Sequence, residues 1–443
     1  MKTIKKATRV IIAIILIILS SCSKDDDAPQ NKEPQVANQE FTIAEDVKEK
    51  EVLATIVVVN TENDPLTFSI TTNDNDLFTI TQKGELTLAI GKTLNYNIAQ
   101  SHTIIIEVSD GTNTTAASIT ITVTNVDDVY ALGTEENSAG IRIPMLWKNG
   151  EATVLPSNTA NQTFAKAVAV ANNGDVYVAG YEQNVLNSSA ILWKNGEVIQ
   201  LADPNKISIA NDIYIINDDI YVSGNEVVVF SNPNGTTSSV STATVWENGE
   251  ATHYTNVENR ATQGKSIYVL GNDVYVAGTI KGLVGNFPVF WKNGELNILS
   301  NGNVAEATAI YVTEDDVYVT GYEISTPSVP ILWKNDEDTV LPLGTNSGAE
   351  PQDIYVSNND VYVVGYHGDT SNFWKNNTLV NGLNDAAFIF FNTVHVSGNN
   401  TYLGGAEFNT TKQKNIATIW KNEEKIPLTD GSNNAIVNDV VVK

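Results

Sequence analysis

Three segments of the sequence place a tyrosine and an ionisable side chain directly after the glycine that closes an apolar run. The residues are Tyr181 with Glu182, Tyr322 with Glu323, and Tyr366 with His367. A tyrosine offers an apolar ring with a polar tip, which suits stacking on a sugar or packing against a protein partner. We therefore predict these six residues as candidate ligand contacts. The alternative interpretation is that they only cover the edges of sheets.

Catalytic signatures are absent from the sequence. It contains no G-x-S-x-G turn, H-E-x-x-H pair, P-loop, repeated Asp-box or G-x-G-x-x-G segment between a strand and a helix. A single cysteine excludes a disulfide within the chain and a thiolate zinc cluster, and four scattered histidines argue against a multi-histidine metal site. Lone carboxylates from distant segments can still meet in a fold. The alternative to ligand binding is therefore a hydrolase or lyase that acts on polysaccharide.

The elements that position the tyrosines are predicted from seven tryptophans, all within residues 128–443. They are Trp147, Trp193, Trp246, Trp291, Trp333, Trp374 and Trp420. Successive tryptophans lie 41 to 53 residues apart, and a period of this size indicates a repeat architecture. Five of them open a Trp-Lys-Asn or Trp-Glu-Asn segment that continues with Gly or Glu, as in Trp193-Lys194-Asn195-Gly196. Because each occupies the same position in its repeat, we predict that the tryptophans pack between repeats and bind no ligand.

A second signature stands ahead of each tryptophan and defines the strands of the repeat. It reads Asp-Val-Tyr-Val-Ala-Gly at residues 175–180 and recurs from Asp128, Asp219, Asp273, Asp316, Asp360 and, in weaker form, Asn400. Each repeat holds four strand-like runs, and an Asn-Gly pair between the third and fourth suits a two-residue hairpin turn. Four strands in each of seven repeats predict an all-β, seven-bladed β-propeller. The pattern resembles kelch-like propellers, without their paired-glycine motif.

The two ends of the repeat region complement each other. The region begins at Asp128 with a second strand, whereas residues 434–442 form a first strand with no repeat after it. We expect these strands to pair, so that the C-terminal strand closes the propeller and hides its sheet edges. Turns between first and second strands are short, whereas loops between second and third strands are long, as at residues 225–241. The long-loop face, which carries the three tyrosines, is the predicted binding face.

Residues 37–127 predict a separate β-sandwich at the N-terminal side of the propeller. Strand-like runs alternate apolar and polar residues, and clusters of Asn, Asp and Gly separate them. The segment resembles a cadherin repeat. Leu66-Thr67-Phe68-Ser69-Ile70, Gly84-Glu85-Leu86 and Val108-Ser109-Asp110-Gly111 follow one another in the order of that family. The resemblance implies a cadherin-like sandwich of two antiparallel sheets.

The cadherin resemblance also implies a calcium site at one end of the sandwich. The residues that match or replace the family's ligands are Glu45, Asn60, Glu62, Asn95, Asn97, Asp110, Asp127 and Asp128. Ca²⁺ takes about six to eight oxygen ligands, with several carboxylates among them. Several acidic ligands of the family are asparagines here, and each replacement removes a formal charge. We therefore leave two interpretations open, weak calcium binding and a metal-free sandwich.

Residues 1–36 predict an export signal followed by a membrane anchor. A basic segment precedes the apolar run from Val10 to Leu19, which is too short to span a bilayer but suits a signal peptide over residues 1–21. Leu19-Ser20-Ser21-Cys22 resembles the lipobox of bacterial lipoproteins, which implies lipidation of Cys22. The acidic segment after it resembles the export signal of Bacteroidetes surface lipoproteins. Residues 22–36 are then a lipidated, flexible tether. The alternative is a secreted protein with a single thiol.

Charge and export restrict the partners. The chain holds 26 basic and 52 acidic residues, a net charge of −26, which becomes −30 when the four positive charges of the signal are removed. Such acidity argues against nucleic acid and against electrostatic attachment to an anionic bilayer. We predict a non-enzymatic, lipid-anchored protein of the outer membrane, facing the cell exterior and acting in binding or adhesion. The propeller would bind a glycan or protein, the cadherin-like module would make homophilic contacts, and calcium would be the only cofactor.

Overall fold

The computed structural model describes residues 31–443 apart from 63, 97, 158–161, 232–235, 255–259, 284, 300–302, 344–347, 368–369 and 381–387. The predicted signal peptide, Cys22, most of the tether and Asn97 lie outside the described residues. The chain divides into two compact units, an N-terminal unit that ends at Asp127 and a C-terminal unit that spans Asp128–Lys443. The predicted all-β class is confirmed, since strands form both units and a single 3-10 turn, η1 (Asp74–Asp76), is the only helical element in the described ranges. Within those ranges, no helix has the length and apolar composition needed to cross a membrane.

The N-terminal unit consists of two small sheets. The four-stranded sheet has the order β1 (Gln39–Ala44), β7 (Thr114–Thr124), β6 (Ser101–Ser109), β3 (Thr67–Thr72). The three-stranded sheet has the order β2 (Ala54–Thr55), β5 (Glu85–Leu88), β4 (Phe78–Ile80). All neighbours are antiparallel except β1 and β7, which run parallel.

One hydrophobic core lies between these two sheets. Strand β6 alternates exposed and buried positions, as expected for a sheet that covers a core on one face. Its Ile104 and Ile106 belong to the same buried cluster as Phe78 and Leu86 of the other sheet. The two sheets therefore stabilise each other by burying apolar side chains from both inner faces.

The C-terminal unit consists of seven four-stranded antiparallel sheets. We give the sheets in the order of their second strands along the chain, and the strands of each sheet from first to fourth. The first two sheets are β35 (Ala435–Val442), β8 (Val129–Glu136), β9 (Arg142–Lys148), β10 (Glu151–Val154); and β11 (Gln162–Val170), β12 (Val176–Gln183), β13 (Ser188–Lys194), β14 (Glu197–Gln200). The next two are β15 (Ser208–Ile216), β16 (Asp219–Ser231), β17 (Thr237–Glu247), β18 (Glu250–Tyr254); and β19 (Thr262–Leu270), β20 (Asp273–Lys281), β21 (Asn286–Lys292), β22 (Glu295–Ile298). The last three are β23 (Ala305–Val312), β24 (Val317–Glu323), β25 (Val329–Lys334), β26 (Glu337–Val340); β27 (Glu350–Ser357), β28 (Asp360–His367), β29 (Thr370–Lys375), β30 (Thr378–Leu379); and β31 (Ile389–Ser397), β32 (Asn400–Asn409), β33 (Lys414–Lys421), β34 (Glu424–Pro427).

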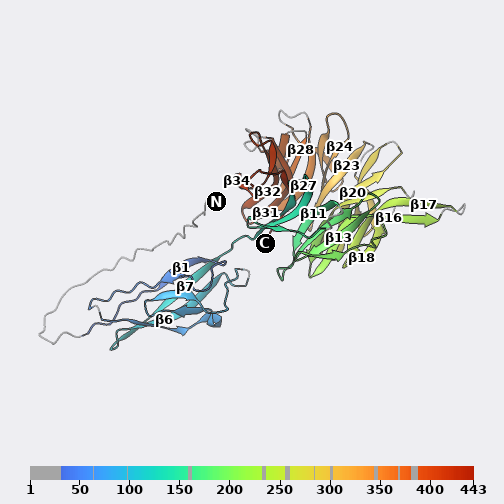
Figure 1. Cartoon of the computed structure of the whole chain (residues 1–443). Helices are drawn as coiled ribbons and strands as arrows, with labels where there is room; N and C mark the ends of the chain where they lie inside the picture. Colours follow the sequence, from blue (N-terminus) through green and yellow to red (C-terminus); the bar gives the residue numbers. More distant parts are fainter. Residues whose placement is uncertain are drawn as a thin grey trace. The chain divides into compact units, whose positions relative to one another are not determined.

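The seven sheets form a ring, which is the arrangement of a β-propeller (Figure 1). Their first strands, β11, β15, β19, β23, β27, β31 and β35, each contact the first strand of the next sheet, and β35 contacts β11. The sheet that completes the ring joins the two ends of the unit, because the C-terminal strand β35 pairs with β8 from Val442 opposite Val129 to Ala435 opposite Glu135. A ring closed in this way leaves no first strand without a neighbour.

The repeated tryptophans lie between sheets. All seven are at most 3% exposed, and each occupies a third strand. Trp246 of β17, for example, belongs to a buried cluster with Tyr177 and Ala179 of β12 in the preceding sheet. This position in every sheet accounts for the tryptophan period of the sequence.

The two repeat signatures of each sheet are joined by a hydrogen bond at the tight turns. In the β35 sheet, Asn149 Nδ2 donates to Asp128 Oδ1 at 2.7 Å, Lys148 pairs with Asp128 at 2.8 Å, and the Lys148 ammonium lies 5.0 Å from the Tyr130 ring centre. Asn149 and Gly150 both have positive φ, which Asn and Gly tolerate best. The Asn-to-Asp hydrogen bond recurs in five further sheets, at Asn195, Asn248, Asn293, Asn335 and Asn376. In the seventh sheet Asn422 donates to Asn400 instead.

Removal of residues 434–443 should abolish cooperative unfolding of the C-terminal unit. The truncation deletes β35, leaves β8 without its partner and exposes the core that Val437 and Val440 fill. Thermal unfolding followed by circular dichroism would measure the effect. Val437→Asp, at a fully buried position, should lower the melting temperature by several degrees or more, whereas Ile426→Asp on the outer strand β34 should change it little. A truncated chain that melts like the full chain would contradict ring closure by β35.

Candidate functional site

Each of the seven first strands contains a β-bulge at the same place. An extra residue interrupts the pairing between the first and second strand of every sheet. The seven extra residues are Lys166, Asn211, Lys265, Thr308, Gln352, Asn392 and Asn438, and we call them the bulge ring. A bulge changes the direction of a side chain relative to the regular alternation of a strand. Every first strand therefore presents one polar side chain in a direction that regular alternation would not give it.

All seven side chains of the bulge ring line one pocket of 840 Å³, which we call the central pocket. This volume lies within the range of about 300–1,000 Å³ that is usual for small-molecule sites. Other lining residues come from the ends of second strands, such as Tyr181 and Tyr366, and from the start of third strands, such as Arg142 and Asn415. The central pocket therefore opens on the face that carries the loops between second and third strands.

The asparagines of the bulge ring join neighbouring sheets. Asn211 Nδ2 donates to the Gly264 carbonyl at 2.7 Å, Asn392 Nδ2 to the Val437 carbonyl at 2.8 Å, and Asn438 Nδ2 to the Ala165 carbonyl at 3.0 Å. Each bond crosses from one first strand to the next, where the bulge frees a carbonyl group. The wall of the pocket is thus held by side chains that also face its interior.

Three aspartates directly follow bulge-ring residues, and their carboxyl groups lie between sheets, although each residue as a whole is half-buried. Asp212 accepts the backbone N–H of Ile267 at 2.8 Å, and Asp353 accepts that of Val394 at 2.8 Å. Asp439 accepts the N–H of Val168 at 2.7 Å, a bond that links β35 to β11. Burial raises the pKa of Asp212 to about 6 and that of Asp353 to about 7, and it also raises the pKa of Asp439.

Two of the six residues predicted as ligand contacts line the central pocket. Tyr181 stacks on Phe164 of the paired strand with ring centres 4.7 Å apart, and burial raises its pKa. Tyr366 also lines the pocket, and its ring meets the Phe390 ring edge-on with ring centres 5.8 Å apart. The structure therefore brings these two tyrosines to opposite sectors of one site.

The other four predicted contacts lie outside the pocket lining. The half-buried Tyr322 donates to Glu306 at 3.4 Å, and Glu306 in turn pairs with Lys265 of the bulge ring at 2.6 Å. Glu323 accepts a hydrogen bond from Asn303. Glu182 and His367 are half-buried at the ends of β12 and β28, and His367 Nδ1 lies 3.8 Å from Glu350.

The bulge ring was not among the ligand contacts predicted from the sequence, although all of its side chains line the pocket. A signal for them exists, because each first strand carries a polar residue beside small or apolar neighbours, as Lys166 does between Ala165 and Ala167. One such residue looks like ordinary alternation in a strand. Only its recurrence at the same position in seven repeats distinguishes a ring from seven unrelated surface residues.

The residues predicted to bind calcium make local hydrogen bonds in the N-terminal unit. Glu45 accepts the N–H groups of Tyr96 at 2.8 Å and Val126 at 3.0 Å. Asp110 accepts N–H groups from Thr112 and Asn113, and the bond from Asn113 contributes most to holding its pKa below the usual value.

The remaining predicted ligands also have partners within their own unit. Asn60 donates to the Asp64 carbonyl, Glu62 accepts the N–H of Lys32, Asn95 accepts the N–H of Ile98, and Asp127 accepts from Asn125. Asp128 belongs to the C-terminal unit, where it pairs with Lys148. In the ranges that the structure describes, no three His, Cys, Asp or Glu side chains gather closely enough to hold a metal ion. Calcium binding stays a prediction.

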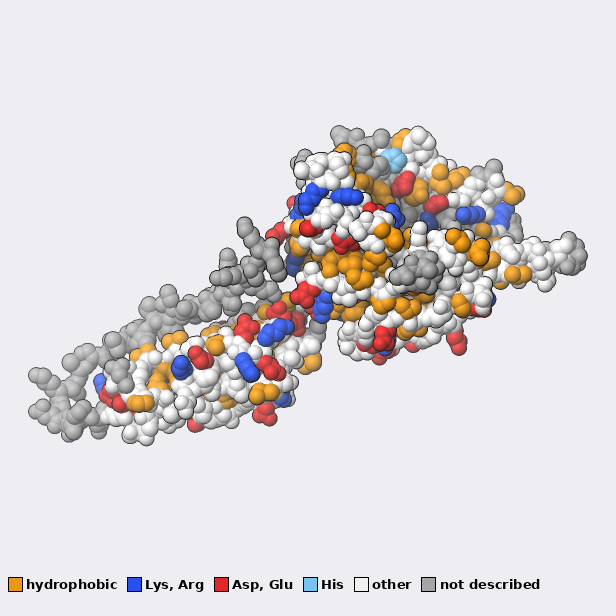
Figure 2. Space-filling model, in the orientation of Figure 1, with side chains coloured by type: hydrophobic (Ala, Val, Ile, Leu, Met, Phe, Trp, Pro, Cys, Tyr) orange, Lys and Arg blue, Asp and Glu red, His pale blue; other side chains and the backbone are white. Residues whose placement is uncertain are grey.

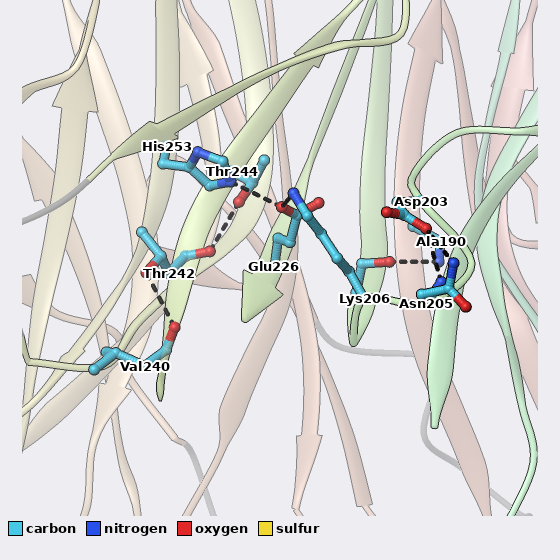
Figure 3. Close-up of polar contacts among 10 residues, drawn as sticks. Ala190, Asp203, Asn205, Lys206, Glu226, Val240, Thr242, Thr244 and His253 are labelled. Carbon is cyan, nitrogen blue, oxygen red and sulfur yellow. Dashed lines mark hydrogen bonds and ion pairs between the residues drawn. The ribbon is translucent and has the colours of Figure 1, made fainter. Parts of the chain in front are cut away.

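A second ionisable cluster lies in the β15 sheet, around Glu226 (Figure 3). The Glu226 side chain is 2% exposed, and its Oε1 lies 2.5 Å from Lys206 Nζ and 3.2 Å from His253 Nε2. Lys206 precedes the first strand β15, and His253 lies on the fourth strand β18. The carboxylate therefore connects the two edges of the sheet. Glu226 does not line the central pocket, and we interpret its contacts as stabilising the sheet.

Comparisons with known proteins add fold similarity at low identity. The sequence matches no protein-family profile and no curated protein. A quinonprotein alcohol dehydrogenase-like protein from Bacteroides thetaiotaomicron is similar over 92% of this chain and 99% of that one, with 10% identity and a TM-score of 0.40. The β-propeller domain of the trilobed protease from Pyrococcus furiosus is similar over 74% and 95%, with 9% identity and a TM-score of 0.42. Human mucin-like protocadherin EC1-2 is similar over 22% of this chain and 56% of that one, with 16% identity and a TM-score of 0.20.

The buried aspartates should make stability fall as the pH rises from about 4 to about 7. A carboxyl group whose pKa is raised by folding favours the folded state while it is protonated, and this contribution is lost as it ionises. Asp353→Asn cannot ionise, so its melting temperature should decrease less between pH 4.5 and pH 8 than that of the native chain. Asp338→Asn on the exposed strand β26 is the matched control and should keep the native slope. Equal slopes in all three proteins would show that Asp353 is already ionised at pH 4.5.

Proposed function

We propose that this protein is a surface-exposed lipoprotein in which a cadherin-like sandwich carries a seven-bladed propeller that binds a glycan or protein. The observation that carries the proposal is the central pocket, a ring of polar side chains on the long-loop face with Tyr181 and Tyr366 among its walls. Aromatic rings beside amide groups are the side chains that proteins use to hold sugars, because the rings cover C–H faces and the amides pair with hydroxyl groups.

Apolar loop tips on the same face support contact with a larger partner. Val185 and Leu186 in the loop between β12 and β13, and Leu283 between β20 and β21, are 99%, 88% and 94% exposed. Large apolar side chains that stand in water favour association, because a partner would remove their surface from solvent. A polymer or protein that covers this face would contact these tips.

The composition of the pocket wall supports binding over hydrolysis. Glycoside hydrolysis commonly uses two carboxyl groups about 5–10 Å apart. The lining of the central pocket contains one carboxylate, Glu136, whose Oε2 accepts a hydrogen bond from Asn434 at 2.8 Å. A hydrolase or lyase on this scaffold would need a second carboxylate from outside this lining.

Attachment to the outer membrane, facing the cell exterior, is proposed on the sequence alone. The lipobox-like segment at Leu19 to Cys22 and the acidic residues after it support export and lipidation. The cadherin-like unit would act as a spacer or make homophilic contacts. Mass spectrometry of the protein extracted from membranes would test the anchor, and an unmodified Cys22 would contradict it.

Screening the chain from Ser23 onward on glycan and protein arrays should identify a ligand, and pocket variants should weaken its binding. Tyr181→Ala and Tyr366→Ala remove the aromatic walls and should each reduce affinity about tenfold or more. Val154→Ala, on the exposed outer strand β10, is the control and should bind like the native chain. Absence of any ligand on both arrays, or binding that neither tyrosine affects, would contradict the proposal.

The calcium prediction has its own test. If the cadherin-like unit binds calcium, titration calorimetry should give a dissociation constant in the range of about 10⁻⁴–10⁻³ M, and calcium should raise the melting temperature. Glu45→Gln should remove the heat, whereas Glu40→Gln, at an exposed position of β1, should retain it. A native chain without calcium heat would establish the metal-free sandwich.

A further inference from the structure

The central pocket has a charge balance opposite to that of the whole protein. The chain holds twice as many acidic as basic residues, and the face seen in Figure 2 mixes both kinds. Among the residues that line the central pocket, however, the bases are Lys166, Lys265 and Arg142, and the acid is Glu136. Lys265 is neutralised by Glu306 at 2.6 Å. Lys166 and Arg142 form no ion pair or hydrogen bond through their side chains with any residue that the structure describes.

Lys166 is the cation whose surroundings most favour an anionic ligand. Its ammonium group opens to the pocket beside the ring of Tyr181, at 5.9 Å from the ring centre. The pocket walls remove part of its hydration, which lowers its pKa, and no carboxylate compensates for that loss. An unpaired ammonium group that the pocket walls partly desolvate attracts an anion more strongly than one surrounded by bulk water on all sides.

Acceptors for hydroxyl groups lie on either side of the two cations, since Asn225 belongs to the sheet that follows that of Lys166 and Asn415 to the sheet that precedes that of Arg142. Asn225 is 9% exposed, and its Oδ1 has no hydrogen-bond partner among the described residues. Asn415 Oδ1 is likewise buried without a partner, and both asparagines line the central pocket. Buried amide oxygens normally accept a hydrogen bond, so each of these two side chains would accept one from a ligand hydroxyl by turning its oxygen toward the pocket. Phe164 and Tyr181 provide the adjoining aromatic surface.

We propose that the central pocket binds an acidic saccharide, with Lys166 and Arg142 holding the carboxylate of a sugar acid and the buried asparagines accepting its hydroxyl groups. This inference rests on the proposed function and names its ligand class. Arg142 on β9, Lys166 on β11 and Asn225 on β16 come from three consecutive sheets, so the predicted carboxylate subsite occupies one sector of the bulge ring. The ring of Tyr181 lies in the same sector and would cover the apolar face of the sugar.

The test compares acidic oligosaccharides with their methyl esters, which keep the sugar and its hydroxyl groups but lose the charge. A panel of galacturonate, glucuronate and mannuronate oligomers and their esters would be titrated against the chain from Ser23 onward. At least one acid should bind about tenfold or more tightly than its ester. The preference should fall as salt rises, because an ion pair that faces solvent is screened.

Variants of the two cations assign the effect to the central pocket. Lys166→Met keeps the apolar stem but removes the charge, and Arg142→Gln does the same at the second position. Both should abolish the preference for the acid over its ester while leaving the melting temperature unchanged. Lys281→Met, an exposed lysine at the end of β20 that does not line the pocket, is the control and should retain the preference.

The outcomes separate this inference from the proposed function. If a glycan or protein binds through Tyr181 and Tyr366 but no acid is preferred over its ester, the acidic-saccharide inference fails and the proposed function stands. If an acid is preferred but Lys166→Met and Arg142→Gln both retain the preference, the carboxylate of the ligand binds elsewhere and the inference fails. If no ligand of any class binds, the proposed function fails with it.

Discussion

Closure of the ring by β35 is the interaction on which the rest of the C-terminal unit depends. Without β35, the second strand β8 would leave backbone donors and acceptors unpaired along one edge, and such an edge promotes aggregation. Pairing of β35 with β8 satisfies that edge and brings together segments about three hundred residues apart in the chain. The same strand carries Asn438 and Asp439, which bond to β11 through Ala165 and Val168. The pocket wall is therefore complete only when the ring is.

Polar groups at the centre of the ring must hydrogen-bond between sheets and also face the pocket. Seven bulges interrupt pairing and free carbonyl groups, and the asparagines of the bulge ring restore part of that hydrogen bonding across sheets. Buried aspartates do the same for backbone N–H groups, at the cost of carboxyl groups that are hard to ionise. Polar side chains at the axis thus hold the sheets together and form the surface that a ligand would meet. Lys166 makes no such bond with any residue that the structure describes, and its charge faces the pocket.

The sequence determined the number and order of the repeats. The period of the tryptophans and the Asp-Val-Tyr and Trp-Lys-Asn signatures are visible because each has a local cause that every repeat must satisfy. Trp246 packs against the preceding sheet, and Asn149 adopts a turn conformation and bonds to Asp128. The pairing of the two ends was also predictable, because the first repeat lacks a first strand and the last residues form one. Of the candidate contacts, Tyr181 and Tyr366 followed from their place after a glycine that closes an apolar run, although β12 and β28 continue past that glycine to Gln183 and His367.

Only the tertiary structure decided what the centre of the ring contains. A bulge shifts a side chain to the other face of its strand, and the period of a sequence does not show where such a shift occurs. Lys166 and Asn211 therefore look like residues of an ordinary alternating strand until the pairing register is known. The charge balance of the pocket likewise cannot be predicted from the sequence alone. The net acidity of the chain is a sum over its surface, whereas the pairing of Lys265 with Glu306 and the lack of a partner at Lys166 depend on distances between sheets.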